Sequence, residues 1–272
     1  MTPLRRALLT VFLVSLVIFV CVPILFVLIT SFNAKGIFPI RSGYEFSLQW
    51  YRGLPANFFR GFKISLIVGC ASTLIAIGPG IMAAFAIARG SFRGKQLLGN
   101  IFLSPLVLPL IVLGVSFYRY FTLVSDFTGL PLLDSYWGLI LAHAGFTWAY
   151  VIRAVVAGLE NFDLELEHAA ADLGAGLWYR LLHVTLPTIR PSIIGGVIFA
   201  FLISFDDVPV SLFLYGSETT PLPIELMNYM EDQIDPYITA MSTLTVAFSV
   251  ALMLVVERTI GMRRLVGLPE EA

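Results

Sequence analysis

The sequence predicts an all-α membrane protein with six transmembrane helices and a cytoplasmic helix-turn-helix insert between the fourth and fifth. Of its 272 residues, 58% are hydrophobic and only 13% are charged, with a mean hydropathy of +0.87, whereas soluble domains contain about 25% charged residues. The apolar residues form long uncharged runs, and a helix needs roughly 20 such residues to cross a bilayer. One polar stretch, residues 160–190, interrupts these runs and provides the insert.

Charged residues bound the apolar runs. Lys63 and Arg89 enclose the second run, and Lys95 precedes the third. The first run is too long for the core of a signal peptide and lacks a small-residue cleavage site, so we expect it to be a span. We predict one membrane domain over residues 1–272, with spans at about 7–31, 64–88, 96–120, 135–158, 191–214 and 236–257.

The distribution of Lys and Arg predicts the orientation. With the N-terminus inside, eleven of the 17 Lys and Arg residues lie on the inner side, including Arg263 and Arg264, while Arg41 is among the outer ones. Cytoplasmic loops carry the excess of positive charge, so both termini are expected in the cytoplasm. The net charge of −1 provides no bulk attraction to nucleic acid.

The polar stretch 160–190 is too long for a tight turn and should have its own structure. Asp163 is a suitable N-cap, and Gly174 can adopt the left-handed conformation that ends a helix. We expect a second short helix over 177–184, stopped by Leu186-Pro187 because the residue before a proline disfavours helix. Periodicity alone leaves a second interpretation open, an amphipathic connector lying on the inner leaflet.

This stretch resembles the EAA loop in the permease subunits of ABC importers. The pattern of that family is Glu-Ala-Ala, three residues, Gly, nine residues, a branched apolar residue, one residue, and Leu-Pro. Aligned on Gly174, every spacing fits, but His168 stands at the position of the glutamate and Glu167 precedes it. The resemblance implies that the loop inserts into a cleft of an ATPase, with coupling residues Glu167, His168, Ala169, Ala170, Asp172, Gly174, Leu186 and Pro187.

The resemblance also implies the function and the partners. It predicts a multi-pass permease subunit in a bacterial inner membrane, working with a second permease subunit, a dimeric cytoplasmic ATPase and an extracytoplasmic substrate-binding protein. The chain itself is expected to bind no cofactor or metal, because ATP and Mg belong to the ATPase. Whether the second permease is distinct or a copy of this chain is open.

The segment Ser204–Ser211 is similar to the fifth span of permeases for spermidine, putrescine and related compounds, which favours a small cationic or nitrogenous solute. Opine and amino-acid-like solutes remain alternatives. Carboxylates near the bilayer centre cost about 2.5–3.5 kcal/mol each and should face protein or water. We therefore name Ser204, Asp206 and Asp207 as candidate pathway residues. One acid would attract the cation while the other caps backbone amides at a break near Pro209, or both would cap or pair, for example with Arg119 or with a partner chain.

The sequence argues against an enzyme. The nearest approach to a phosphate-binding loop, residues 90–96, is one residue short and lacks the final Ser or Thr. His143, His168 and His183 are scattered and indicate no catalytic set. The competing class is an ion-coupled secondary transporter, which Asp206 and Asp207 favour but the spacing of the insert does not.

Overall fold

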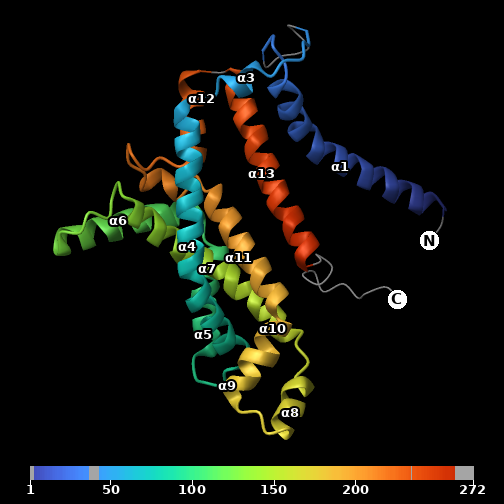
Figure 1. Cartoon of the computed structure of the whole chain (residues 1–272), viewed down its shortest axis with the longest axis vertical. Helices are drawn as coiled ribbons and strands as arrows, with labels where there is room; N and C mark the ends of the chain where they lie inside the picture. The colour runs from blue at the N-terminus through green and yellow to red at the C-terminus, as the bar shows by residue number, and fades with distance from the viewer. Residues whose placement is uncertain (1–2, 37–42, 234, 261–272) are drawn as a thin grey trace. The chain divides into compact units, whose positions relative to one another are not determined.

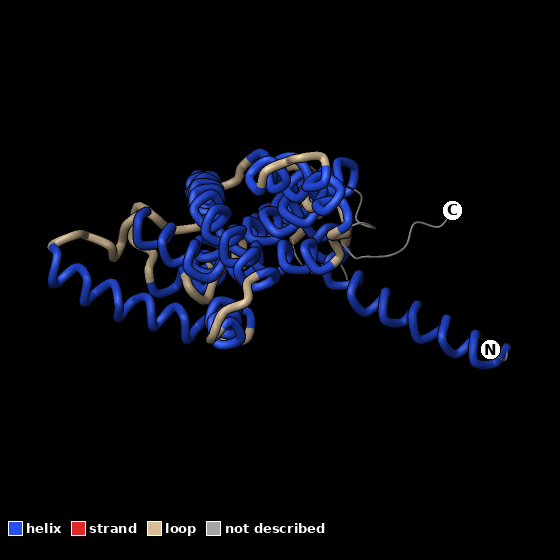
Figure 2. Tube along the Cα trace, turned by 90° about the horizontal axis from the view of Figure 1, so that it is seen from below, coloured by secondary structure: helices blue, strands red, loops and turns tan. Residues whose placement is uncertain are grey.

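This computed structural model describes residues 3–36, 43–233 and 235–260. Within these ranges the chain forms helices and loops without a strand (Figure 2), apart from one isolated antiparallel bridge between Asn33 and Phe46. Arg41, Arg263 and Arg264, which contribute to the predicted orientation, lie outside the described residues.

The helices follow the order labelled in Figure 1. They are α1 (Pro3–Ser31), α3 (Gln49–Arg52), α4 (Ala56–Arg89), α5 (Lys95–Leu103), the 3-10 turn η1 (Ser104–Leu106), α6 (Leu110–Thr128), α7 (Tyr136–Glu160), α8 (Glu165–Asp172), α9 (Leu177–Arg180), the π-helical turn η2 (Leu181–Thr185), α10 (Leu186–Thr188), α11 (Arg190–Phe205), the 3-10 turn η3 (Ser211–Phe213), α12 (Leu222–Asp232) and α13 (Pro236–Ile260).

Five of the described helices are long and apolar enough to cross a membrane, and a sixth crossing results if one bent pair counts as a single span. That pair consists of residues 177–188 and α11, which meet at an angle of 65°. The first, second, fourth and last predicted spans each correspond to one long helix, namely α1, α4, α7 and α13.

The third predicted span, 96–120, is wrong as a continuous helix. The chain forms α5 and η1, leaves the helix at residues 107–109, and begins again with α6, which runs on to Thr128. Pro109 stands at the N-cap of α6. A proline disfavours helical backbone at the residue before it and has no amide to donate, so the helix restarts after Pro109 rather than passing through it.

The fifth predicted span, 191–214, is shorter than expected. Its helix, α11, ends at Phe205, with Asp206 at the C-cap. The chain then forms η3 instead of a further turn of α-helix. Pro209 explains the interruption, because it cannot donate to the carbonyl four residues earlier.

The described chain divides into two compact units. One contains residues 1–59 and 226–251, and the other contains residues 60–225 and 252–272. In the first unit, Trp50 donates from Nε1 to the carbonyl of Asn33 at 2.9 Å and meets Tyr237 edge to face. Every described side chain of α1 up to Phe26 is exposed, as expected of a helix whose solvent is lipid.

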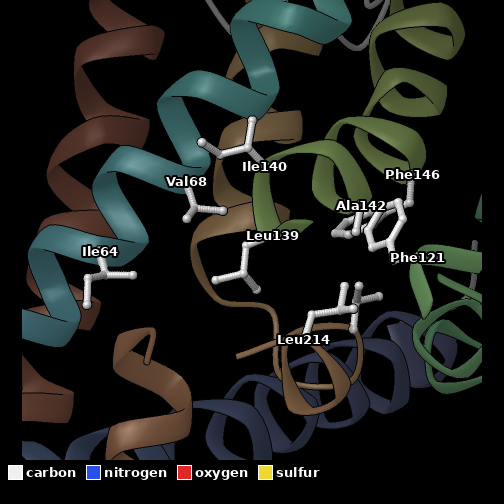
Figure 3. Close-up of a cluster of buried hydrophobic side chains, with 9 residues drawn as sticks. Ile64, Val68, Phe121, Leu139, Ile140, Ala142, Phe146 and Leu214 are labelled. Atoms are coloured by element: carbon white, nitrogen blue, oxygen red, sulfur yellow. The ribbon is translucent and has the colours of Figure 1, made fainter. Parts of the chain in front are cut away.

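The second unit has two buried apolar clusters, both built around α7. Figure 3 shows the first cluster, where Leu139 and Ile140 of α7 meet Ile64 and Val68 of α4. The second cluster includes Val151, Ile152, Val155, Val156 and Leu159 of α7, with Ala84 of α4 and Ala200 of α11. Because α7 faces α4 and α11 along its length, it is the central helix of this unit.

Small residues bring α7 and α11 close together. A Cβ atom on Gly196 of α11 would lie 2.8 Å from the Cβ atom of Ala154 and 3.2 Å from the Cα atom of Val151. No flexible side chain lies between them, so only a displacement of one helix would admit even a methyl group. The close approach of the two helices therefore requires glycine at 196.

We expect Gly196→Ala to destabilise the folded protein by about 1–3 kcal/mol through overpacking. The matched control is Gly78→Ala in α4, where a new Cβ atom meets no other atom within 4 Å and alanine favours helix. Thermal unfolding in detergent measures the difference. Equal melting temperatures for the two variants would show that the helices adjust without cost.

Candidate functional site

The chain after α11 is stabilised by one carboxylate. Oδ2 of Asp207 accepts hydrogen bonds from the backbone amides of Val210 at 3.1 Å and Ser211 at 2.8 Å. These amides follow the interruption at Pro209 and open η3. Asp207 therefore has the geometry expected of the acid that caps the break.

The two neighbouring acids differ in their surroundings. Asp207 is buried, with 4% of its surface exposed, whereas Asp206 is exposed. Neither acid forms an ion pair with Arg119 in the described part of the chain, so the structure does not contain that example of internal pairing. Of the two carboxylates, Asp206 is the one that remains accessible to a solute.

A buried histidine links the two sides of the break. His143 of α7 is 1% exposed; its Nδ1 lies 2.7 Å from Oγ of Ser204, at the end of α11, and its Nε2 lies 3.1 Å from Oγ of Ser211, beyond the break. Nε2 is also 3.7 Å from Oδ2 of Asp207. Ser204 in turn lies 3.1 Å, hydroxyl to hydroxyl, from Ser72 of α4.

This polar cluster, formed by Ser72, His143, Ser204, Asp207 and Ser211, joins three helices at one point. Ser204 belongs to it, so its side chain is occupied by internal hydrogen bonds rather than directed to a solute. The role of His143 could not be predicted from the sequence, because its partners are 61 and 68 residues away. The available signal was a single histidine within an apolar run, a position where a buried polar group needs a partner.

Replacing His143 should destabilise the break. A leucine at this position would remove the imidazole contacts to the hydroxyls of Ser204 and Ser211, at about 0.5–1.5 kcal/mol for each hydrogen bond lost. We expect His143→Leu to lower the melting temperature in detergent by several degrees. His183→Leu is the matched control, because His183 is exposed. An equal effect of the two substitutions would contradict the structural role of His143.

The insert has the two helices and the bend that were predicted. Oδ1 of Asp163 accepts a hydrogen bond from the amide of Glu165 at 3.0 Å, at the start of α8. Gly174 adopts the left-handed conformation, with φ of +86°. The chain then turns back into α9, which lies beside α8 at one end of its unit (Figure 1).

The expectation that Leu186-Pro187 stops the second helix is wrong. The chain passes from α9 through η2 into α10, and the sharp bend comes at Ile189, before α11. In η2 the amide of Leu186 donates to the carbonyl of Leu181, five residues back. This wider turn precedes Pro187, whose ring would crowd the carbonyl four residues earlier in a regular α-helix.

The structure places Glu167 inside the insert. Nη1 of Arg89, the last residue of α4, is 2.5 Å from Oε1 of Glu167, and the hydroxyl of Thr185 donates to the same oxygen. Burial opposes ionisation of Glu167, but the hydrogen bonds from Thr185 and Arg89 and the charges of Arg89 and Arg180 outweigh it, so its pKa is lowered. Glu167 is therefore ionised at neutral pH.

The other candidate coupling residues lie mostly on the outer side of the insert. The side chain of His168 is 64% exposed and its Nδ1 lies 3.6 Å from Oε1 of Glu165. Ala169, Asp172, Gly174 and Pro187 are exposed, while Ala170 and Leu186 are half-buried. Several large apolar side chains of the insert are also exposed, namely those of Leu173, Leu177, Trp178, Tyr179 and Leu182.

Comparison with known proteins gives a consistent picture. Residues 76–261 match the family described as binding-protein-dependent transport system inner membrane component. The putrescine transport system permease protein PotI of Escherichia coli (strain K12) is 32% identical over 229 residues, which cover 83% of this chain and 81% of PotI. The spermidine/putrescine transport system permease protein PotC of Haemophilus influenzae is 31% identical over 234 residues, covering 85% and 88%.

A solved structure shares the fold. A chain in the crystal structure of a bacterial ABC transporter involved in the import of the acidic polysaccharide alginate superposes with a TM-score of 0.71 at 16% identity. The match covers 95% of this chain and 98% of that one. The two chains therefore share an overall fold.

Proposed function

This chain belongs to the family of binding-protein-dependent transport system inner membrane components, and on this premise we propose that it is the permease subunit of an ATP-driven polyamine importer. The observation that carries the substrate class is its similarity to permeases named for putrescine and spermidine. The exposed carboxylate of Asp206 is consistent with a cationic solute. The chain would form half of the pathway and would take its energy from a partner ATPase.

The proposed complex contains this permease, a second permease subunit, two ATPase copies on the cytoplasmic side and a binding protein on the outer side. Both termini and the insert would face the cytoplasm, as the Lys and Arg distribution predicts. The chain would bind no cofactor, with ATP and Mg held by the ATPase. Its family favours this arrangement over an ion-coupled secondary transporter.

The insert would dock into the ATPase through its outer face. Exposed apolar side chains such as Leu173, which is 90% exposed, are the kind that a partner buries. Ala169 is small enough to allow close approach, and the left-handed Gly174 sets the bend between the two helices. His168, in the position of the family's glutamate, lies on this face and would replace a carboxylate with an imidazole at the contact.

In the proposed pathway, Asp206 attracts the amine and Asp207 holds the backbone. The first role rests on the exposure of Asp206 beside a break in a membrane helix. The second rests on the two amide hydrogen bonds to Asp207. The division of roles between the two adjacent acids follows from the end of α11 at Phe205: Asp206 at the C-cap is exposed, whereas Asp207 beyond it is buried.

The first test is energetic. The complete complex, reconstituted in liposomes with its binding protein, should accumulate labelled putrescine only when ATP is present on the ATPase side. A proton or sodium gradient without ATP should drive no uptake. Uptake driven by an ion gradient in this chain alone would support a secondary transporter instead. ATP-driven uptake of an amino-acid-like solute, without uptake of putrescine, would reject the polyamine assignment.

The second test separates the two acids. Asp206→Asn should lower the rate of putrescine uptake at saturating binding protein by about tenfold, since a charged hydrogen bond contributes roughly 1.5–3 kcal/mol. Asp207→Asn should have a smaller effect, because the amide oxygen can still accept from the backbone of Val210 and Ser211. Asp126→Asn, on the exposed face of α6, is the control for a lost charge. Unchanged uptake by both variants at normal expression would remove the pathway role.

A further inference from the structure

Within the insert, α8 makes few contacts that would hold it in place by apolar burial. No residue of α8 is buried, and Leu164 and Leu166 near its start are exposed. The side chain of Glu167 is only 16% exposed, against 84% for Glu165 two residues earlier. The carboxylate of Glu167, rather than a buried apolar face, therefore holds α8 in place.

That carboxylate joins three segments of the chain. Oε1 of Glu167 receives the guanidinium of Arg89, from the end of α4, and the hydroxyl of Thr185, from η2. Phe85 and Phe162 hold the guanidinium of Arg89, whose carbon lies 5.6 Å and 5.1 Å from their ring centres. Stacking and the ion pair together restrict Arg89 to one position.

The ion pair between Arg89 and Glu167 should contribute more to stability than an exposed salt bridge does. Exposed ion pairs contribute little because water screens them and both side chains lose freedom. Here 27% of the Arg89 side chain and 16% of the Glu167 side chain are exposed, and the aromatic rings already order the guanidinium. Arg is always charged, and Glu167 has a lowered pKa, so the pair persists at neutral pH.

We propose that Glu167 and Arg89 form an internal latch that fastens the insert to α4 and passes the movement of the insert to that helix. The proposal rests on the coupling role proposed above, and it changes the part assigned to Glu167. Adjacent helical residues point about 100° apart: His168 faces outward, where a partner would dock, while Glu167 faces α4. Glu167 is then a positioning residue within the permease rather than a contact of the ATPase.

Through the ion pair between Glu167 and Arg89, a movement of the insert would reach the break after α11 by way of α4. Between Arg89 and Ser72, 17 residues or about 25 Å apart at 1.5 Å per residue, the chain remains within the single helix α4, which contains Pro79. Ser72 belongs to the polar cluster around His143, through its contact with Ser204. Displacement of α8 would thus move the same helix that supports the capped break. The insert is already joined covalently to α7 and α11, and the latch adds α4 as a third helix.

The test uses the complete complex in liposomes and compares Glu167→Gln with Glu165→Gln, a matched change on the same helix. We expect Glu167→Gln to lower the putrescine taken up per ATP hydrolysed by about tenfold, equivalent to ~1.4 kcal/mol of lost coupling. ATP hydrolysis itself should continue, because the docking face is unchanged. Glu165→Gln should behave as the wild type. Equal uptake per ATP for Glu167→Gln and the wild type would overturn the latch.

A second measurement does not depend on transport. Hydrogen exchange of the backbone amides of α8 in the whole complex should quicken in Glu167→Gln and not in Glu165→Gln. In an Arg89→Gln background, Glu167→Gln should produce no further change, since the partner is already gone. If the two substitutions quicken the hydrogen exchange of α8 additively, the pairing of Glu167 with Arg89 is contradicted. If the wild-type complex shows no ATP-driven uptake, the proposed function fails, while the exchange data still decide whether the latch exists.

Discussion

The constraint on which the structure depends is that a chain in lipid must satisfy its backbone hydrogen bonds internally. After α11 stops at Phe205, the amides of Val210 and Ser211 at the start of η3 find their acceptor in the carboxylate of Asp207. A carboxylate at a helix C-terminus is unfavourable toward the helix dipole, and here the amides of η3 compensate for it. Specific side chains therefore stabilise the break after α11, namely His143 from α7 and Ser72 from α4.

Breaks of this kind explain which parts of the fold could be predicted. The uncharged runs identified α1, α4, α7 and α13, because apolar length is a local property of the sequence. The same signal failed for 96–120, where an apolar run hides a change from η1 to α6 at Pro109. Prolines indicate where a helix can break, but whether it does depends on the side chains that receive the freed groups, and these come from distant segments.

The candidate site likewise combines features that the local sequence predicts with features that depend on distant residues. The sequence of the insert predicted the left-handed Gly174 and a hydrogen bond to the side chain of Asp163 near the start of α8, since both act on their own neighbours in the chain; the N-cap itself is Leu164. The sequence could not predict that the side chain of Glu167 faces α4, because its partner Arg89 lies 78 residues away. His143 was missed for the same reason. Long-range pairs of polar residues, rather than local patterns, decide which charged side chains face inward.

The arrangement in the insert has a consequence for its docking face. If the ion pair with Arg89 keeps Glu167 turned toward α4, then the residues beside it are turned outward by helix geometry alone. The ring of His168, the next residue along α8, is accordingly 64% exposed. The half-buried ion pair therefore does two things at once: it fixes α8 to α4, and it sets which face of α8 stays exposed.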